Sequence, residues 1–210
     1  MVFTDLLRAR LKKRFFERET ITVAQDLIGK LIVLKHQDTL LVGMIVETEG
    51  YRSDDEASHT FRGKTVRNSA MFGPVGHAYV YLIHGIHYGF NVVARDSSVI
   101  AGGVLIRAVE PLWGVAVMAR RRGIENTLDK KITNGPGKLT QAFGIDMRYK
   151  HHNFLTPSTF FIANNILHPD LPYDIQRSER IGISKSQSHL WRFFIKGNRY
   201  VSPFKLKKVQ

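Results

Sequence analysis

Two carboxylates and a phenol recur at alternate positions of one short segment of this 210-residue chain. Residues 40–49 form a predicted strand, and alternate side chains of a strand share a face, which here would carry Ile45, Glu47, Glu49 and Tyr51. Carboxylates held close together on a partly buried face repel each other, so the pKa of at least one rises and suits it to acid–base catalysis. A solvent-facing strand edge with scattered charge has the same spacing, and spacing alone favours that alternative.

Aromatic residues form a second candidate group. Tyr79 and Tyr81 share one face of another predicted strand, and Tyr51 and His59 could join them if the hairpins pack together. Flat rings around a cleft can stack on a nucleobase. Aromatic residues in strands more often belong to the core, so both interpretations remain open.

His84 lies at the tip of a predicted hairpin, where strands 78–83 and 86–94 join across the two-residue turn 84–85. A turn residue can need a positive φ, which His tolerates better than most residues. A side chain at such a tip can protrude from the body of the protein. An ordinary exposed turn residue is the simpler interpretation.

The sequence carries no pattern typical of a metal or P-loop site. It has no Cys and no His-Glu-x-x-His motif, and His84 and His87 would lie on opposite faces of a regular strand. Residues 135–138, Gly-Pro-Gly-Lys, could offer backbone amides to a phosphate, but they lack the P-loop spacing. Residues 120–122 are three arginines that would complement a helix dipole first and contact phosphates second.

The charge balance points to a polyanionic partner. The chain has 31 Lys and Arg against 18 Asp and Glu, a formal net charge of +13. Such a field attracts DNA, RNA or an anionic membrane surface. The most apolar stretch, 104–118, contains Arg107 and Glu110 and is too short to span a bilayer. The absence of Cys permits a reducing compartment, and we expect a cytosolic or nuclear protein.

The elements that must position these residues alternate without a repeat or a linker. The predicted helices are 4–17, 20–27, 65–72, 112–122 and 138–143, and the predicted strands are 31–35, 40–49, 78–83, 86–94, 102–109 and 158–163. The economical interpretation is one α+β domain over residues 1–210, with the helical segment 1–26 packed on it. The segment 190–195 is apolar enough to pack back onto the domain.

Taken in chain order, the segments closely resemble the alkyladenine (3-methyladenine) DNA glycosylase family of base-excision repair. The resemblance runs from about Leu27 to Ser202, and its specificity comes from the order of the motifs rather than from any one of them. The motifs are residues 45–51, 55–59, 67–68, 71–72, 79–81, 90–91, 105–111, 135–139, 191–193 and 197–198.

The resemblance implies roles for residues of the site. It implies that Glu49 is the general base and that Arg107 helps to hold the attacking water and a nearby phosphate. Tyr51, His59 and Tyr81 would enclose the extruded base, to which His59 would also offer a hydrogen bond.

The resemblance also assigns residues at the edge of this pocket. Asn91 matches a residue that lines the pocket and screens out normal guanine. His84 occupies the hairpin tip, where the family commonly has a Tyr that wedges into the minor groove. An imidazole fills less space than a phenol, although it can stack and, when protonated, can meet phosphate. Leu190 and Arg199 stand where prolines are expected, which affects local loop rigidity only.

The implied protein is a monofunctional DNA glycosylase. It would flip alkylated or deaminated purines such as 3-methyladenine, 7-methylguanine, hypoxanthine and ethenoadenine out of duplex DNA and leave an abasic site. Because the matched site contains no Lys, we expect no strand cleavage. The implied fold is α+β, a single mixed domain around a curved antiparallel β-sheet with flanking helices and a protruding β-hairpin.

The resemblance implies neither a metal nor an organic cofactor. The expected partner is double-stranded DNA that contains damaged purines, bound by a monomer without a membrane, in the cytoplasm near the nucleoid of a bacterium or in the nucleus of a eukaryote. The alternative is a non-catalytic basic nucleic-acid-binding module. A carboxylate in a DNA-facing cleft weakens phosphate binding, so a pure binding protein would gain nothing from Glu47 and Glu49.

Overall fold

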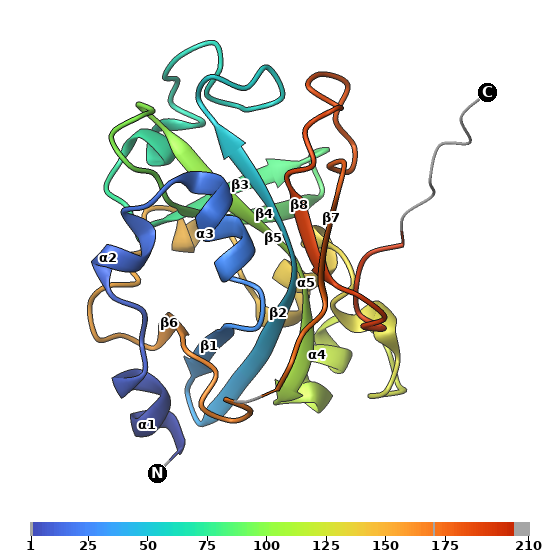
Figure 1. Cartoon of the computed structure of the whole chain (residues 1–210). Coiled ribbons are helices and arrows are strands. Elements are labelled where there is room, and N and C mark those ends of the chain that lie inside the picture. Colours follow the sequence, from blue (N-terminus) through green and yellow to red (C-terminus); the bar gives the residue numbers. More distant parts are fainter. Residues whose placement is uncertain (1, 170, 204–210) are drawn as a thin grey trace, which may run out of the picture.

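One antiparallel sheet of eight strands forms the framework of residues 2–169 and 171–203, the part of the chain that the computed structural model describes (Figure 1). Six strands follow one another in the order β3-β4-β5-β2-β1-β6, and β8 pairs with both β2 and β7. The sheet is curved and antiparallel, and helices flank it (Figure 1). The predicted α+β fold is therefore confirmed. The strands are β1 Leu31–His36, β2 Thr39–Arg52, β3 Ala78–Ile83, β4 His87–Val93, β5 Gly102–Trp113, β6 Phe160–Ala163, β7 Ile175–Ser178 and β8 Arg192–Ile195.

Strand β2 is 14 residues long and connects the sheet to the site. Along one edge it pairs with β5, and along the other its residues 39–44 pair with β1 and its residues 47–49 with β8. The predicted 31–49 hairpin is therefore confirmed. Strands β7 and β8 were not predicted, although the apolar segment around β8 does pack back onto the domain as expected.

Short helices surround the sheet. They are α1 Val2–Arg8, α2 Lys13–Phe16, α3 Thr20–Asp26, α4 Val115–Arg121 and α5 Pro136–Phe143, with single 3₁₀ turns at Ser69–Phe72, Lys130–Ile132 and Met147–Tyr149. The predicted helix 65–72 is thus reduced to one 3₁₀ turn. The predicted helix 112–122 begins only at Val115, because β5 continues to Trp113 and Gly114 turns the chain with a φ of 73°.

The prediction of one helix over residues 4–17 is wrong. Two helices form instead, because the chain between them lies beside β6: Arg10 bridges to Ala163, and the Leu11 amide donates to the Ile162 carbonyl at 2.8 Å. Leu11 is buried there. The apolar residues of this segment therefore belong partly to an extended stretch and not to one continuous helical face.

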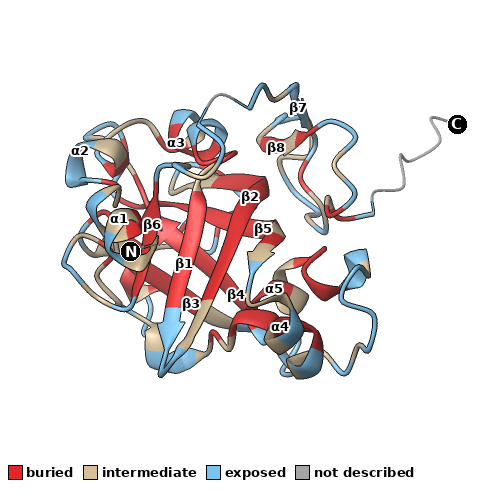
Figure 2. Ribbon diagram, turned by 90° about the horizontal axis from the view of Figure 1, so that it is seen from below, coloured by how far each residue is buried: buried red, intermediate tan, exposed pale blue. Residues whose placement is uncertain are grey.

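The buried residues concentrate on the strands, and the exposed ones on the helices and loops that surround them (Figure 2). Helix α3 packs on β2 at Gly50, where a Cβ would lie 2.5 Å from the Cδ1 atom of Ile21. The Thr48 hydroxyl donates to the Ala24 carbonyl of the same helix at 2.7 Å. This close packing fixes the stretch of β2 on which the two carboxylates lie.

The β3–β4 hairpin has a longer turn than predicted. Ile83 pairs with His87, so three residues connect the strands and not two. His84 and Gly85 have φ values of 48° and 74°, and the Ile86 amide donates to the Ile83 carbonyl at 3.1 Å. The positive φ expected of His84 is confirmed.

In the described part of the chain, no helix has the length and apolar character that crossing a membrane requires.

Candidate active site

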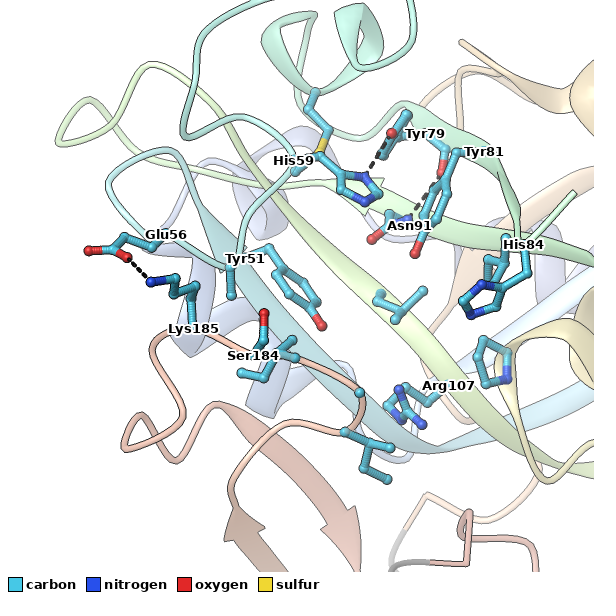
Figure 3. Close-up of a pocket in the computed structure, with 18 residues that line it drawn as sticks. Tyr51, Glu56, His59, Tyr79, Tyr81, His84, Asn91, Arg107, Ser184 and Lys185 are labelled. Atoms are coloured by element: carbon cyan, nitrogen blue, oxygen red, sulfur yellow. Dashed lines mark hydrogen bonds and ion pairs between the residues drawn. The ribbon is translucent and has the colours of Figure 1, made fainter.

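A cavity of about 390 Å³ opens between the β3–β4 hairpin and the segment 181–185 (Figure 3). Its volume falls in the range of about 300–1,000 Å³ that is typical of small-molecule sites. The predicted residues that line it are Tyr51, His59, Tyr81, His84, Asn91 and Arg107. The structure thus brings together side chains from β2, β3, β4, β5 and two loops.

Three aromatic rings form one wall of the cavity. The rings of Tyr79 and Tyr81 stack with centroids 5.2 Å apart and planes at 22°, and His59 meets Tyr81 edge-on at 4.6 Å. Nδ1 of His59 and the Tyr79 hydroxyl are hydrogen-bonded at 3.0 Å. Tyr79 is only 1% exposed and belongs to the core, whereas Tyr81 is partly exposed. The interpretation as a core residue is therefore confirmed for Tyr79, and stacking of Tyr81 on a nucleobase stays a prediction.

The Tyr81 ring lies against the backbone of β4 because its cross-strand partner is Gly89. A Cβ at Gly89 would be 2.7 Å from both Cε1 and Cζ of the ring. The Arg67 guanidinium also lies over this ring, 5.5 Å from its centroid. The position of the ring therefore depends on a residue that has no side chain.

His59 is held through its backbone and is kept neutral by its surroundings. The Asn68 side-chain amide donates to the carbonyls of His59 and Gly63 at 2.7 and 2.9 Å. Burial, together with the positive charge of Arg67, lowers the pKa of His59 below its ordinary value of 6.5. The imidazole is therefore uncharged at neutral pH.

Asn91 extends the wall from β3 to β4. Its side chain is buried, and Nδ2 donates to the Tyr79 carbonyl at 3.3 Å. Asn91 pairs with Leu105 of β5, which also lines the cavity. Its amide is thus fixed beside the aromatic rings.

The two carboxylates are buried, so the solvent-exposed alternative is wrong. Glu47 and Glu49 are both 0% exposed, and Arg107 contacts both. Its Nε donates to Glu47 Oε1 at 2.9 Å, and its Nη1 donates to Glu49 Oε2 at 3.1 Å. Glu47 and Glu49 therefore share a face as predicted.

The alternation that placed Ile45 on the same face is interrupted. Glu47 pairs with Ala108 and Thr48 with Ile106, so the register shifts here and Arg107 has no partner on β2. Another register shift lies between Ile45 and Glu47. Such bulges re-aim side chains near active sites. Here Ile45 belongs to the hydrophobic core, while Arg107 meets both carboxylates.

The expected rise in a carboxylate pKa is not found at Glu47. Burial would raise the pKa of Glu47, but the charges of Arg107 and Arg192 and a hydrogen bond from the Ser202 amide together lower it below 4.5. Arg192 Nε donates to Glu47 Oε1 at 2.7 Å, and the Ser202 amide donates to Oε2 at 2.7 Å. Glu47 is therefore a fully bonded anion that organises the arginines.

Glu49 is held by three donors. Besides Arg107, the Tyr51 hydroxyl donates to Oε2 at 2.8 Å and the Ile181 amide donates to Oε1 at 2.7 Å. Burial and the charge of Glu49 raise the pKa of Tyr51 well above 10, so its phenol remains a donor. Glu49 does not itself line the cavity, but Tyr51 and Arg107 do.

The residues from the C-terminal part of the chain were not predicted as site residues. Ile181 and Arg192 contact the two carboxylates, and residues 181–185 line the cavity opposite the aromatic wall. The motif 191–193 was the available signal for Arg192, because it sets an Arg within an apolar run. No comparable pattern surrounds Ile181.

His84 lies at the exposed tip of the hairpin and also lines the cavity. The end of the hairpin next to its turn rests on α5, where a Cβ at Gly137 would come within 2.8 Å of His87 Cβ. The Gly-Pro-Gly-Lys motif therefore has a packing role, and Lys138 donates to the Asn134 side chain at 2.8 Å.

Among the described residues, no cluster of three or more His, Cys, Asp or Glu side chains could hold a metal ion. Lys185, which is not among the residues that the resemblance assigned to the site, also lines the cavity. Its Nζ lies 3.9 Å from a Glu56 oxygen, and its side chain is 66% exposed. Figure 3 shows this pair away from Arg107.

The model of the methylpurine-DNA glycosylase family matches residues 14–199, nearly the whole chain. The chain belongs to this family. A relative from Carboxydothermus hydrogenoformans is 41% identical over 192 residues, which cover 91% of this chain and 98% of the relative. A relative from Methanoculleus marisnigri is 44% identical over 194 residues, which cover 91% of this chain and 98% of that relative. Both relatives carry the name 3-methyladenine DNA glycosylase.

A third relative with the same name, from Chlorobium phaeobacteroides, is 46% identical over 195 residues, which cover 90% of this chain and 95% of the relative. The protein is therefore a DNA glycosylase, a hydrolase of the N-glycosyl bond, and its partner is DNA. The alternative of a non-catalytic binding module is set aside.

Proposed function

We propose that this glycosylase accepts alkylated or deaminated purines flipped out of duplex DNA and that Glu49 is its general base. The substrates would be of the class of 3-methyladenine, 7-methylguanine, hypoxanthine and ethenoadenine. The observation that carries the proposal is the buried Glu49 carboxylate, hydrogen-bonded by Arg107, Tyr51 and the Ile181 amide beside an aromatic cavity.

Flipping follows from where the reacting bond lies. A base inside the duplex cannot be reached, and extracting it costs a few kcal/mol, less for a lesion that pairs or stacks poorly. The net charge of +13 supplies phosphate affinity that does not depend on sequence. His84, exposed at the hairpin tip and at the edge of the cavity, would fill the gap that the nucleotide leaves.

The aromatic residues would select the base. The rings of Tyr51, Tyr81 and His59 offer faces and edges to a purine, and electron-rich rings favour cationic alkylated purines. The lowered pKa of His59 supports this role, because an uncharged imidazole does not repel a cationic base. The buried Asn91 amide would obstruct the amino group of normal guanine.

Glu49 would act on water at the sugar. The glycosidic bond breaks with oxocarbenium character, which a nearby carboxylate stabilises while it also takes a proton from the attacking water. A carboxylate oxygen can accept two hydrogen bonds, and Oε1 of Glu49 accepts from the Ile181 amide. The water would bind between Glu49 and the cavity, where Arg107 would help to hold it and the nearby phosphate.

We infer that the product is an intact strand with an abasic site. Strand cleavage would need an amine that forms a Schiff base, and such lysines are typically desolvated or placed beside another cation. Lys185 is largely exposed and paired with a carboxylate, so it has neither feature. We further propose that the enzyme acts as a monomer, in the nucleoid of a bacterium or in the nucleus of a eukaryote.

The test is single-turnover excision from duplexes that each carry one of the four lesions, read by alkaline cleavage at the abasic site. Loss of a general base costs about two to four orders of magnitude in rate. Glu49→Gln should therefore lose base release by that factor and keep its affinity for the duplex. Glu56→Gln, at an exposed carboxylate of the same cavity, is the matched control and should remain active. Near-normal excision by Glu49→Gln would overturn the assignment.

Borohydride trapping tests the inferred absence of strand cleavage. A covalent complex between the wild-type protein and abasic DNA that Lys185→Met does not form would contradict it.

A further inference from the structure

A second buried ion pair lies beside the site and has no part in the proposed chemistry. Arg180 and Asp55 both have 0% side-chain exposure. Arg180 Nη1 donates to Asp55 Oδ2 at 2.5 Å, and Nη2 donates to Oδ1 at 3.1 Å. This bidentate pair joins the loop after β2 to the segment after β7, two parts of the chain 125 residues apart.

The same guanidinium reaches the strand that carries the catalytic residues. Arg180 Nη1 also donates to the Gly50 carbonyl at 2.9 Å, between Glu49 and Tyr51 in the sequence. Its Cζ lies 4.7 Å from the centroid of the Tyr51 ring and 5.0 Å from that of Trp191. Arg180 therefore contacts the backbone between Glu49 and Tyr51 and the ring of Tyr51, but it does not itself line the cavity.

The next residue explains why this placement matters. The Ile181 amide donates to Glu49 Oε1, and the four residues that follow it line the cavity. Because Ile181 is covalently attached to Arg180, displacement of Arg180 moves this amide away from the carboxylate. The wall formed by residues 181–185 would move with it.

We propose that Arg180 is a positioning residue of the reaction: its buried pairing with Asp55 keeps the Ile181 amide on Glu49 and residues 181–185 against the cavity. This inference rests on the proposed role of Glu49. Stability alone is a poor explanation for the pair, because a buried ion pair is often no more stabilising than two apolar residues of similar size. Arg is suited to the position because its planar fork binds the carboxylate in two places while its face lies on aromatic rings.

The test uses three variants and one control. Arg180→Met removes the cation, and Arg180→Lys keeps the charge without the fork. The double variant Asp55→Asn/Arg180→Met leaves no charge unpaired, so its folding stability should approach that of the wild type. The control is Arg148→Met, which breaks the bidentate Arg148–Asp146 pair, an exposed pair that does not line the cavity.

Two readouts separate positioning from folding. The first is the single-turnover excision rate at saturating enzyme, and the second is hydrogen exchange of the Ile181 amide measured by NMR. A misplacement of about 1 Å costs on the order of 100-fold in rate. We expect the folded double variant to lose about 10- to 100-fold in rate with unchanged duplex affinity, and to lose protection of the Ile181 amide. Arg180→Lys should keep part of the excision rate and part of the protection of the Ile181 amide. Arg148→Met should change neither the rate nor the protection.

The inference is overturned if the double variant folds and excises at the wild-type rate. It is also overturned if the rate falls while the Ile181 amide stays protected, because Arg180 would then act by another route. Failure of the proposed function looks different: wild-type protein would release no base from any lesion duplex, or Glu49→Gln would excise normally. In that case, hydrogen exchange of the Ile181 amide still decides whether the Arg180–Asp55 pair holds residues 181–185 in place.

Discussion

Replacing Gly89 with Ala should move the Tyr81 ring and weaken binding of the flipped base. The added Cβ would lie 2.7 Å from two ring carbons and 3.0 Å from the hydroxyl oxygen. Carbon atoms prefer separations of about 3.5–4.0 Å, so the ring must retreat by about 1 Å. Strand β4 has little freedom to yield in its place, because Gly89 is paired with Tyr81 of β3 and the strand is paired with β5 from Asn91 onward.

The magnitude follows from what the ring does in the proposed complex. Stacking of a base on an aromatic side chain is worth about 1–3 kcal/mol, and 1.4 kcal/mol corresponds to a factor of ten. Because Tyr81 is displaced and not removed, we expect the flipped complex to weaken by about tenfold. Overpacking should also lower the free energy of unfolding by about 1–3 kcal/mol.

The assay is the flipping equilibrium of an ethenoadenine duplex, followed by its fluorescence, together with the single-turnover excision rate. Tyr81→Leu provides the matched background, since it removes the ring that the new methyl group would strike. In that background Gly89→Ala should have little further effect, so the two substitutions should be strongly non-additive. Additive effects, or an unchanged flipping equilibrium in Gly89→Ala, would refute the reasoning.

Three further predictions follow from the same structure. The pKa of Glu47 is lowered on folding, so Glu47 stabilises the protein above pH 4.5 and this contribution is lost as the pH falls through its folded-state pKa. Glu47→Gln should thus lower the free energy of unfolding in urea at pH 7 by about 3–5 kcal/mol, and a difference that does not shrink at acid pH would contradict this. His84→Tyr should raise the flipping constant and His84→Ala should slow excision most for hypoxanthine opposite thymine, whereas equal flipping constants would mean that the tip is only a turn. Binding to undamaged duplex should weaken with salt with a log–log slope near −0.9 per phosphate neutralised, and a flat response would leave the +13 charge without a role in DNA binding.

The sequence was sufficient for the elements whose pattern is local. Hydrophobic alternation and turn residues predicted the β1–β2 and β3–β4 hairpins, because both signals lie within a few consecutive residues. Strand β8 has only four residues and its partners lie in β2, so nothing local distinguishes it from a loop. Residues 4–17 have helical spacing, but pairing of the intervening chain with β6 overrides this preference.

The sequence predicted which residues line the cavity, but it did not predict the direction in which the pKa of Glu47 shifts. Resemblance selected six residues that do line one cavity. The effect of Arg107 on the pKa of Glu47 depends on two bulges that turn the guanidinium between the carboxylates, and bulges leave no mark in the residue spacing. The contacts of Ile181 and Arg192 with the carboxylates span more than 130 residues, so only the folded chain reveals them.

The pairing of β8 with β2 also affects when the enzyme can become active during its synthesis. A ribosome completes the aromatic wall, Glu49 and Arg107 while Arg192 and Ser202 are still untranslated. Until those two residues emerge, Glu47 lacks two of its three partners and the edge of β2 beyond β1 is unpaired. A nascent chain would therefore carry Glu49 and Arg107 before the contacts that hold Glu47 in place, and the glycosylase would gain activity only after residues 192–202 have left the ribosome.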